Sequence, residues 1–174
     1  GQYARDKDGA VACLLMSQLV SQLRSLNKTL HQRLDELLVE HGCHVERLVN
    51  VQMEGSEGMA NMKQLMKAFR ESPPTQLGGI DVAAVRDYQS LTTRLPDGTS
   101  TKLDATAANM IMLDLAEDGN YFAVRPSGTE PKVKFYLFTY VAPEQLSDMQ
   151  LAREQMDDRL RDMGRDLQAF AESV

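Results

Sequence analysis

The sequence predicts an α+β fold in which helices cover an antiparallel β-sheet. The first observation is that hydrophobic periodicity is helical up to residue 42 and changes after it. The second is the order of predicted elements from residue 43 onward, which is β-α-β-β-β-β-α. The third is that short turn signals separate the later strands, as expected where sequential strands pair.

Two helices are predicted at the start of the chain. Residues 6–27 carry apolar side chains three or four positions apart; Asp8 can cap this helix and Asn27 can end it in the left-handed conformation. Thr29 and Gln32 have the spacing of a capping box at the start of the second helix. No predicted sheet precedes these apolar faces and the first residue is not methionine, so we expect a piece of a longer protein.

After Gly42, which ends the second helix, strand and helix patterns follow in turn. The motif Pro96-Asp97-Gly98 indicates a hairpin excursion near residues 90–104. One predicted strand opens at Gly78-Gly79 and carries Val82, Val85 and Tyr88. The other predicted strands are 45–53, 110–115, 121–124 and 133–140, and the predicted helices are 59–71 and 143–170, with a turn over 54–58.

Composition narrows the classes of function. The net charge of −6 over 174 residues argues against binding to a nucleic-acid backbone or to an anionic membrane surface. Cys13 and Cys43 are the two cysteines, which predicts no disulfide framework and indicates a reducing compartment. No apolar run approaches the ~20 residues that cross a bilayer, and the first residues lack a signal-peptide core. We therefore expect a cytoplasmic protein.

The segment Arg125-Pro126-Ser127-Gly128-Thr129-Glu130-Pro131-Lys132 stands out between two predicted strands. From Arg125 to Lys134 it has three cations against Glu130, in a chain that is acidic overall. Arginine can hold a phosphate through two N–H groups, hydroxyls can add donors, and glycine lets backbone amides approach. A rigid surface turn with solvated charges explains the same composition. Both interpretations remain open on composition alone.

The same segment, continued by Val133-Lys134-Phe135-Tyr136, resembles the phosphate-binding signature of the α-D-phosphohexomutases, the phosphoglucomutase and phosphomannomutase superfamily. The resemblance covers most of the chain and is closest to the phosphoglucomutase branch. The further matching segments, in order, are Arg5-Asp6-Lys7-Asp8-Gly9, Leu30 to Gly42, Glu54-Gly55-Ser56-Glu57-Gly58, Pro73-Pro74, Gly78-Gly79 with Val82, and Asp87-Tyr88.

The resemblance implies a fourth, C-terminal domain of the TATA-binding-protein-like type, β-α-β(4)-α, over residues 43–174. Residues 1–42 would be the helical tail of the preceding, third α/β domain. The resemblance also implies which residues bind the substrate phosphate that is not transferred in a given half of the reaction cycle. They are Arg125, Ser127, Gly128, Thr129, Lys134 and, more weakly, Lys132.

Other parts of the family pattern are missing from this chain. It has no phosphoserine motif of the Ser-His-Asn-Pro type, no Asp-x-Asp-x-Asp magnesium loop and no Glu-x-x-Gly sugar loop. The segment Thr106-Ala107-Ala108-Asn109 is looser than the usual form. We therefore expect no catalytic residue here and no turnover by the chain alone. The Mg²⁺ site of the full-length enzyme should lie outside this chain.

The function expected from the resemblance is interconversion of glucose 1-phosphate and glucose 6-phosphate, or of the mannose phosphates, through glucose 1,6-bisphosphate or its equivalent. The expected partners are a phosphosugar and the remaining domains of the same enzyme. Two alternatives stay open: a phosphopentomutase or bisphosphate synthase of the same branch, and a stand-alone, non-catalytic module that binds a phosphorylated ligand or a protein.

Three weaker features have ordinary structural explanations. His41-Gly42-Cys43-His44 lacks a fourth ligand and zinc-module spacing, which favours a plain helix end over a metal site. Asp157-Asp158 is typical of a solvated helix face. The ten methionines are expected to fill gaps in the core.

Overall fold

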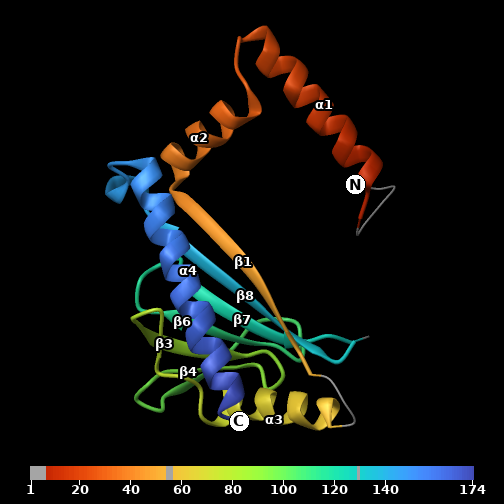
Figure 1. Ribbon diagram of the computed structural model, residues 1–174, viewed down its shortest axis with the longest axis vertical. Helices are drawn as coiled ribbons and strands as arrows, with labels where there is room; N and C mark the ends of the chain where they lie inside the picture. The colour runs from red at the N-terminus through yellow and green to blue at the C-terminus, as the bar shows by residue number, and fades with distance from the viewer. Residues whose placement is uncertain (1–6, 54–56, 129) are drawn as a thin grey trace.

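The computed structural model describes residues 7–53, 57–128 and 130–174. Two helices come first, followed by a sheet with one helix inserted after its first strand and one helix at its end (Figure 1). The elements are α1 (Gly9–Ser25), α2 (Leu30–His41), β1 (Cys43–Gln52), α3 (Gly58–Glu71), β2 (Gln76–Leu77), β3 (Ile80–Asp87), β4 (Thr92–Arg94), β5 (Ser100–Lys102), β6 (Ile111–Leu115), β7 (Tyr121–Pro126), β8 (Lys132–Val141), the 3₁₀ turn η1 (Pro143–Gln145) and α4 (Met149–Glu172).

The strands form one antiparallel sheet in the order β1-β8-β7-β6-β3-β4-β5, and the short β2 pairs with β3 beside this path. The β4–β5 hairpin turns at the predicted Pro96-Asp97-Gly98 motif. With β2 and this hairpin set aside, the remaining order is the predicted β-α-β(4)-α. The prediction of an α+β domain with an antiparallel sheet is confirmed.

Helices α3 and α4 pack on the same face of the sheet and enclose the core. Phe69 of α3 is fully buried, and its ring lies against Phe122 of β7, Phe135 of β8 and Phe170 of α4. In Figure 1, α4 crosses in front of the sheet and α3 lies across its lower end. Of the ten methionines in the sequence, Met62, Met66, Met156 and Met163 are buried, whereas Met16 and Met59 are more than half exposed, so the prediction that the methionines fill the core is correct only in part.

The capping signals predicted for α1 and α2 are both present. The Asp8 carboxylate accepts from the Val11 amide, and Asn27 has a left-handed φ of 54°. Thr29 and Gln32 form the reciprocal capping box. Both helices extend away from the sheet (Figure 1) and carry exposed apolar side chains. These include Val11, Leu14, Leu15, Met16, Leu26, Leu30, Leu34 and Val39.

Several predicted boundaries differ from the structure. The helix predicted over 143–170 begins at Met149, because the Asp148 carboxylate caps the Gln150 and Leu151 amides there. Leu146 therefore lies outside α4, after the 3₁₀ turn. Tyr88 lies just beyond β3, and Met53 just beyond β1. The start predicted at residue 6 and the turn residues 54–56 lie outside the described residues.

Candidate functional site

The segment singled out in the sequence forms the connection between β7 and β8. Arg125 and Pro126 are still strand residues, so β7 extends two positions beyond its predicted end. The Ser127 amide donates to the Lys132 carbonyl at 2.8 Å, which closes the hairpin. Its hydroxyl, rather than its amide, is therefore the group that can meet a ligand. Thr129 lies outside the described residues.

Arg125 and Lys134 face each other across the β7–β8 pair. Because directly paired residues share one face of a sheet, both side chains project on the side opposite the core residues Val124 and Phe135. Within the described residues, neither cation has a carboxylate at ion-pair distance. Two neighbouring uncompensated cations create a local positive potential in an acidic chain, which is suited to an anion.

Lys132 occupies the same face as Lys134, as the alternation predicts, but its charge is compensated. Its ammonium lies 2.5 Å from the Glu130 carboxylate within the same hairpin. The hydrogen bond from Lys132, the charge of Lys132 and then that of Lys134 hold the pKa of Glu130 below its ordinary value. Lys132 is thus engaged with the loop itself, while Lys134 remains available.

The structure adds two amides that the sequence did not indicate. On β1, Asn50 lies opposite Lys134, and Gln52 lies opposite Lys132. Both are exposed, and the pairing puts them on the same sheet face as the cations. Asn50, Lys134 and Arg125 therefore form a row across three strands that can offer amide, ammonium and guanidinium donors to one anion. The sequence alone could not predict this row, because it depends on the register between the strands.

A cleft of about 810 Å³ lies behind the hairpin, between α3 and the ends of β6 and β7. Arg70 lines this cleft, and its side chain is held in place because it donates to Asn109 Oδ1 at 2.6 Å and pairs with Asp87 at 3.4 Å. This contact gives a structural role to Asn109, in the segment that departs from the family pattern. The lining residues are Met59, Met62, Lys63, Met66, Arg70, Gln89, Ala108, Asn109, Met110 and Arg125 to Gly128.

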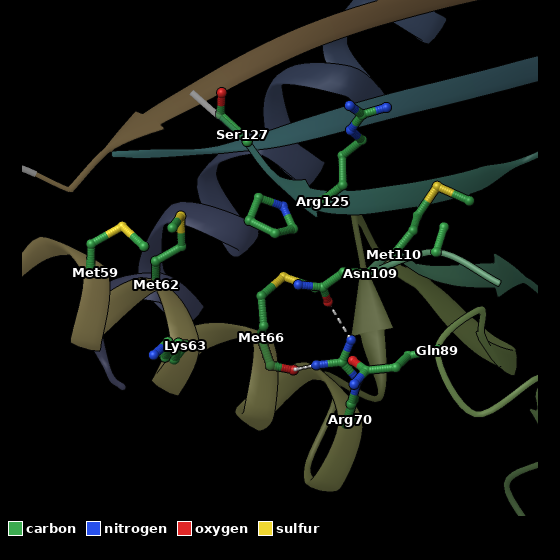
Figure 2. A pocket seen from close by; sticks show the side chains of 13 residues that line it. Met59, Met62, Lys63, Met66, Arg70, Gln89, Asn109, Met110, Arg125 and Ser127 are labelled. Atoms are coloured by element: carbon green, nitrogen blue, oxygen red, sulfur yellow. Dashed lines mark hydrogen bonds between the residues drawn. The ribbon is translucent and has the colours of Figure 1, made fainter. Parts of the chain in front are cut away.

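The cleft and the two cations lie on opposite sides of β7. Figure 2 shows the Arg125 and Ser127 side chains pointing away from Met59, Met66 and Arg70, which lie on the other side of the strand. The candidate anion-binding groups are therefore on the sheet face that α3 and α4 leave uncovered. The cleft behind them is lined by residues 125–128 of the same hairpin and by residues of α3.

The other sequence candidates have structural partners. The His44 ring lies against the Tyr140 ring in a tilted arrangement with centroids 4.5 Å apart, and Tyr140 Oη donates to the His41 carbonyl at 3.2 Å. Cys43 is buried, and burial raises the pKa of its thiol. In the part of the chain that the structure describes, no three His, Cys, Asp or Glu side chains gather as metal ligands.

The adjacent carboxylates of α4 are each held by an arginine. Asp157 pairs with Arg47 at 3.1 Å, and Asp158 pairs with Arg161 of its own helix. Both carboxylates are exposed, as predicted for a solvated helix face. Over 7–53, 57–128 and 130–174, no helix combines the length and apolar character needed to cross a membrane.

Comparisons with known proteins bear on the family and the fold of this chain. Residues 48–154 match the family model described as phosphoglucomutase/phosphomannomutase, C-terminal domain. A phosphoglucomutase of Staphylococcus aureus strain MRSA252 is 35% identical over 136 residues, which is 78% of this chain and 24% of that protein. The phosphoglucomutase of strain USA300 is 34% identical over the same shares.

A solved structure shows the same fold. The open form of the exocytosis-sensitive phosphoprotein pp63/parafusin, a phosphoglucomutase from Paramecium, superposes with a TM-score of 0.53 at 16% identity. The superposition covers 99% of this chain and 28% of that one. This chain thus spans about a quarter of the length of the relatives that it matches.

Proposed function

Because this chain belongs to the phosphoglucomutase/phosphomannomutase family, as its C-terminal domain, we propose that it holds the substrate phosphate of a phosphohexomutase. The observation that carries the proposal is the row Arg125–Lys134–Asn50, in which two cations have no carboxylate partner among the described residues. The Ser127 hydroxyl at the end of β7 and the exposed Gly128 complete the proposed grip, together with Thr129. Lys132 contributes less, because Glu130 holds it.

The proposed reaction of the parent enzyme interconverts glucose 1-phosphate and glucose 6-phosphate through glucose 1,6-bisphosphate. An enzyme that reacts at either end of the sugar needs a fixed hold on the phosphate that is not transferred. A rigid hairpin anchored in the sheet supplies that hold, so attack at the other end becomes effectively unimolecular. The phosphoserine, the Mg²⁺ site and the sugar loop would belong to other parts of the parent, and the chain alone would not turn substrate over.

The proposed domain boundary lies at residue 42. Residues 1–42 would be the tail of the preceding domain and residues 43–174 the phosphate-binding domain. The exposed apolar stripe of α1 and α2 supports this division, because such a stripe is stable when another layer covers it. The remaining domains of the parent would supply that layer and close over the uncovered sheet face, which would exclude water from the phosphate.

Glucose phosphates are the proposed substrates because the similar relatives at 34–35% identity are named phosphoglucomutases. Mannose phosphates and pentose phosphates would use the same phosphate grip, and the sugar loop that would separate them is not in this sequence. A stand-alone phospho-ligand module is the alternative of a different class. An encoding reading frame with upstream Ser-His-Asn-Pro and Asp-x-Asp-x-Asp motifs would decide for the enzyme.

The direct test is to titrate this chain with glucose 1-phosphate and with inorganic phosphate and to monitor binding by the chemical shifts of its backbone amides. We expect shifts at residues 125–134 and Asn50. Arg125→Met should weaken binding about tenfold or more, since a hydrogen bond to a charged group contributes ~1.5–3 kcal/mol. Arg24→Met is the matched control: the same change on exposed α1, which should leave the affinity unaltered.

Two results would contradict the assignment. Shifts confined to the cleft residues of α3 would place the anion on the wrong side of β7. Equal affinities of Arg125→Met and Arg24→Met would mean that the attraction is not made by this row. In the parent enzyme, Arg125→Ala should raise KM and also lower kcat, because the same contact positions the substrate for reaction.

A further inference from the structure

Strand β1 is an edge of the sheet along its full length. Its ten residues pair with β8 on one side, and the sheet order begins with it. The Met53 amide donates to the Pro131 carbonyl at 2.8 Å on the β8 side. The backbone N–H and C=O groups of successive residues in a strand point to opposite sides. Those of the odd-numbered residues of β1 therefore point toward β8, and those of the even-numbered residues point toward the free edge. Among the described residues no strand pairs with this edge, and an open edge of this length is a template for another strand.

The side chains of β1 suit pairing with an identical, antiparallel strand. With the two-fold axis at Leu48, that residue lies opposite its own copy, and Glu46 lies opposite Asn50 of the second copy. Leu48 is 49% exposed in the single chain, so its pairing would cover apolar surface. Arg47 lies opposite Val49 of the second copy, so no like charges meet in this register. A shift that centres the axis on Arg47 would oppose two arginines.

Helix α4 runs beside this edge, and a hollow of about 710 Å³ lies between them. The ion pair Arg47–Asp157 and the shared lining of Val49 and Gly164 place the middle of β1 level with the middle of α4. The helix side chains that line the hollow include two acids and two arginines in strict alternation, which are Asp158, Arg161, Asp162 and Arg165.

This charge pattern is complementary to itself in an antiparallel arrangement. Spacings of three, one and three place all four residues on one stripe of the helix. When α4 is aligned with an antiparallel copy centred between Arg161 and Asp162, Asp158 meets Arg165 of the second copy and Arg161 meets its Asp162. Every acid then faces an arginine. The centre of this alignment lies at the level of Leu48, where the strand register also has its two-fold axis.

Gly164 provides room for this contact. It lies inside α4, where glycine weakens a helix, and a Cβ built there meets nothing within 4 Å. The packing of the single chain therefore does not require a glycine at this position. A second helix could approach α4 closely at this position, because glycine has no side chain.

We infer that the surface formed by the free edge of β1 and the 158–165 stripe of α4 binds a second copy of this chain about a two-fold axis. The sheet continues across the axis through pairs between even-numbered residues of the two β1 strands. The two α4 helices lie antiparallel on the same side of the joined sheet, and their alternating charges set the register.

The test is a charge exchange on α4, read by sedimentation equilibrium. The unmodified chain should approach twice its 19.4 kDa mass at micromolar concentration. The double variant Asp158→Arg/Asp162→Arg should weaken self-association at least tenfold, and so should Arg161→Asp/Arg165→Asp. Mixing the two variants should restore the dimer as a one-to-one hetero-association, because each acidic helix then meets a basic one. All four positions are exposed or half-exposed, so the fold should survive.

The strand half of the interface has its own variant. Leu48→Lys opposes two ammonium groups at the axis and leaves every β1–β8 contact in place, so it should also yield monomers. Leu14→Glu on α1 is the control and should not change the mass. A monomeric unmodified chain overturns the inference. A dimer that survives the charge changes, or one that only Leu14→Glu dissolves, also overturns it, because the exposed helices α1 and α2 would then hold the copies together.

Discussion

The packing of α3 on the sheet depends on the Phe69 side chain, and Phe69→Ala should be the most destabilising truncation in that helix. The ring is completely buried. Its centroid lies 4.7 Å from that of Phe170, 5.5 Å from Phe122 and 6.0 Å from Phe135. It therefore joins α3 to two central strands and to α4, and removing it leaves a void that neighbours from three elements cannot easily fill.

The expected cost follows from these contacts. Truncation of a buried phenylalanine to alanine costs about 3–5 kcal/mol. Three aromatic contacts, each contributing about 0.5–1.5 kcal/mol beyond buried area, place Phe69 at the upper end, about 4–5 kcal/mol. That is a large part of the roughly 5–15 kcal/mol by which a domain is stable. With a urea slope of about 2 kcal/mol per molar, the unfolding midpoint should fall by about 2 M.

The assay is urea unfolding followed by circular dichroism, since the chain has no tryptophan to report by fluorescence. Met59→Ala is the matched control, because Met59 lies on the same helix and is 56% exposed. Met59→Ala should lower the free energy of unfolding by no more than about 0.5 kcal/mol, so its urea midpoint should move very little. A loss below about 1 kcal/mol for Phe69→Ala would refute the idea that this ring fastens α3 to the sheet.

Three further outcomes are expected. Gly42→Ala should lower the melting temperature by about 5 °C or more, because φ is 92° and the added Cβ would lie 2.3 Å from Tyr140 Cε2; an unchanged melting curve would contradict this. Glu130→Gln should raise phosphate affinity about two- to fivefold in a titration, since it releases Lys132; weaker binding would count against the cation arrangement. The same release should occur in wild-type protein as pH falls through the lowered pKa of Glu130. Alkylation of Cys43 should be slow until urea unfolds the chain, because burial raises the pKa of its thiol; rapid alkylation in native buffer would argue against that burial.

Local signals carried most of the correct predictions of the fold. Asn27 in the left-handed conformation and the Thr29 capping box depend on residues within one helical turn, so the sequence contains the whole interaction. The β4–β5 hairpin likewise depends on one turn motif. Helix α4 was placed six residues too early because its apolar spacing continues backward to Leu146, while the Asp148 cap decides where the helix begins.

The candidate site was only partly accessible to sequence reasoning. Alternation correctly put Lys132 and Lys134 on one face, because that periodicity is a property of a single strand. It could not show that Glu130 holds Lys132, or that Asn50 lies beside Lys134, since the latter depends on the register between strands 84 residues apart in the sequence. The resemblance supplied Arg125, and the register supplied its neighbours.

The proposed phosphate site and the proposed self-pairing both involve Asn50, but through different atoms. As an even-numbered residue of β1, Asn50 directs its backbone groups to the free edge, where a second copy would pair. Its side chain stands perpendicular to that direction, on the uncovered sheet face beside Lys134. A second copy at the edge therefore does not cover Lys134 or Arg125, which lie one and two strands further in, respectively. The two proposals can accordingly fail separately: a monomeric Leu48→Lys chain keeps the complete phosphate row, and an Arg125→Met chain keeps the complete edge.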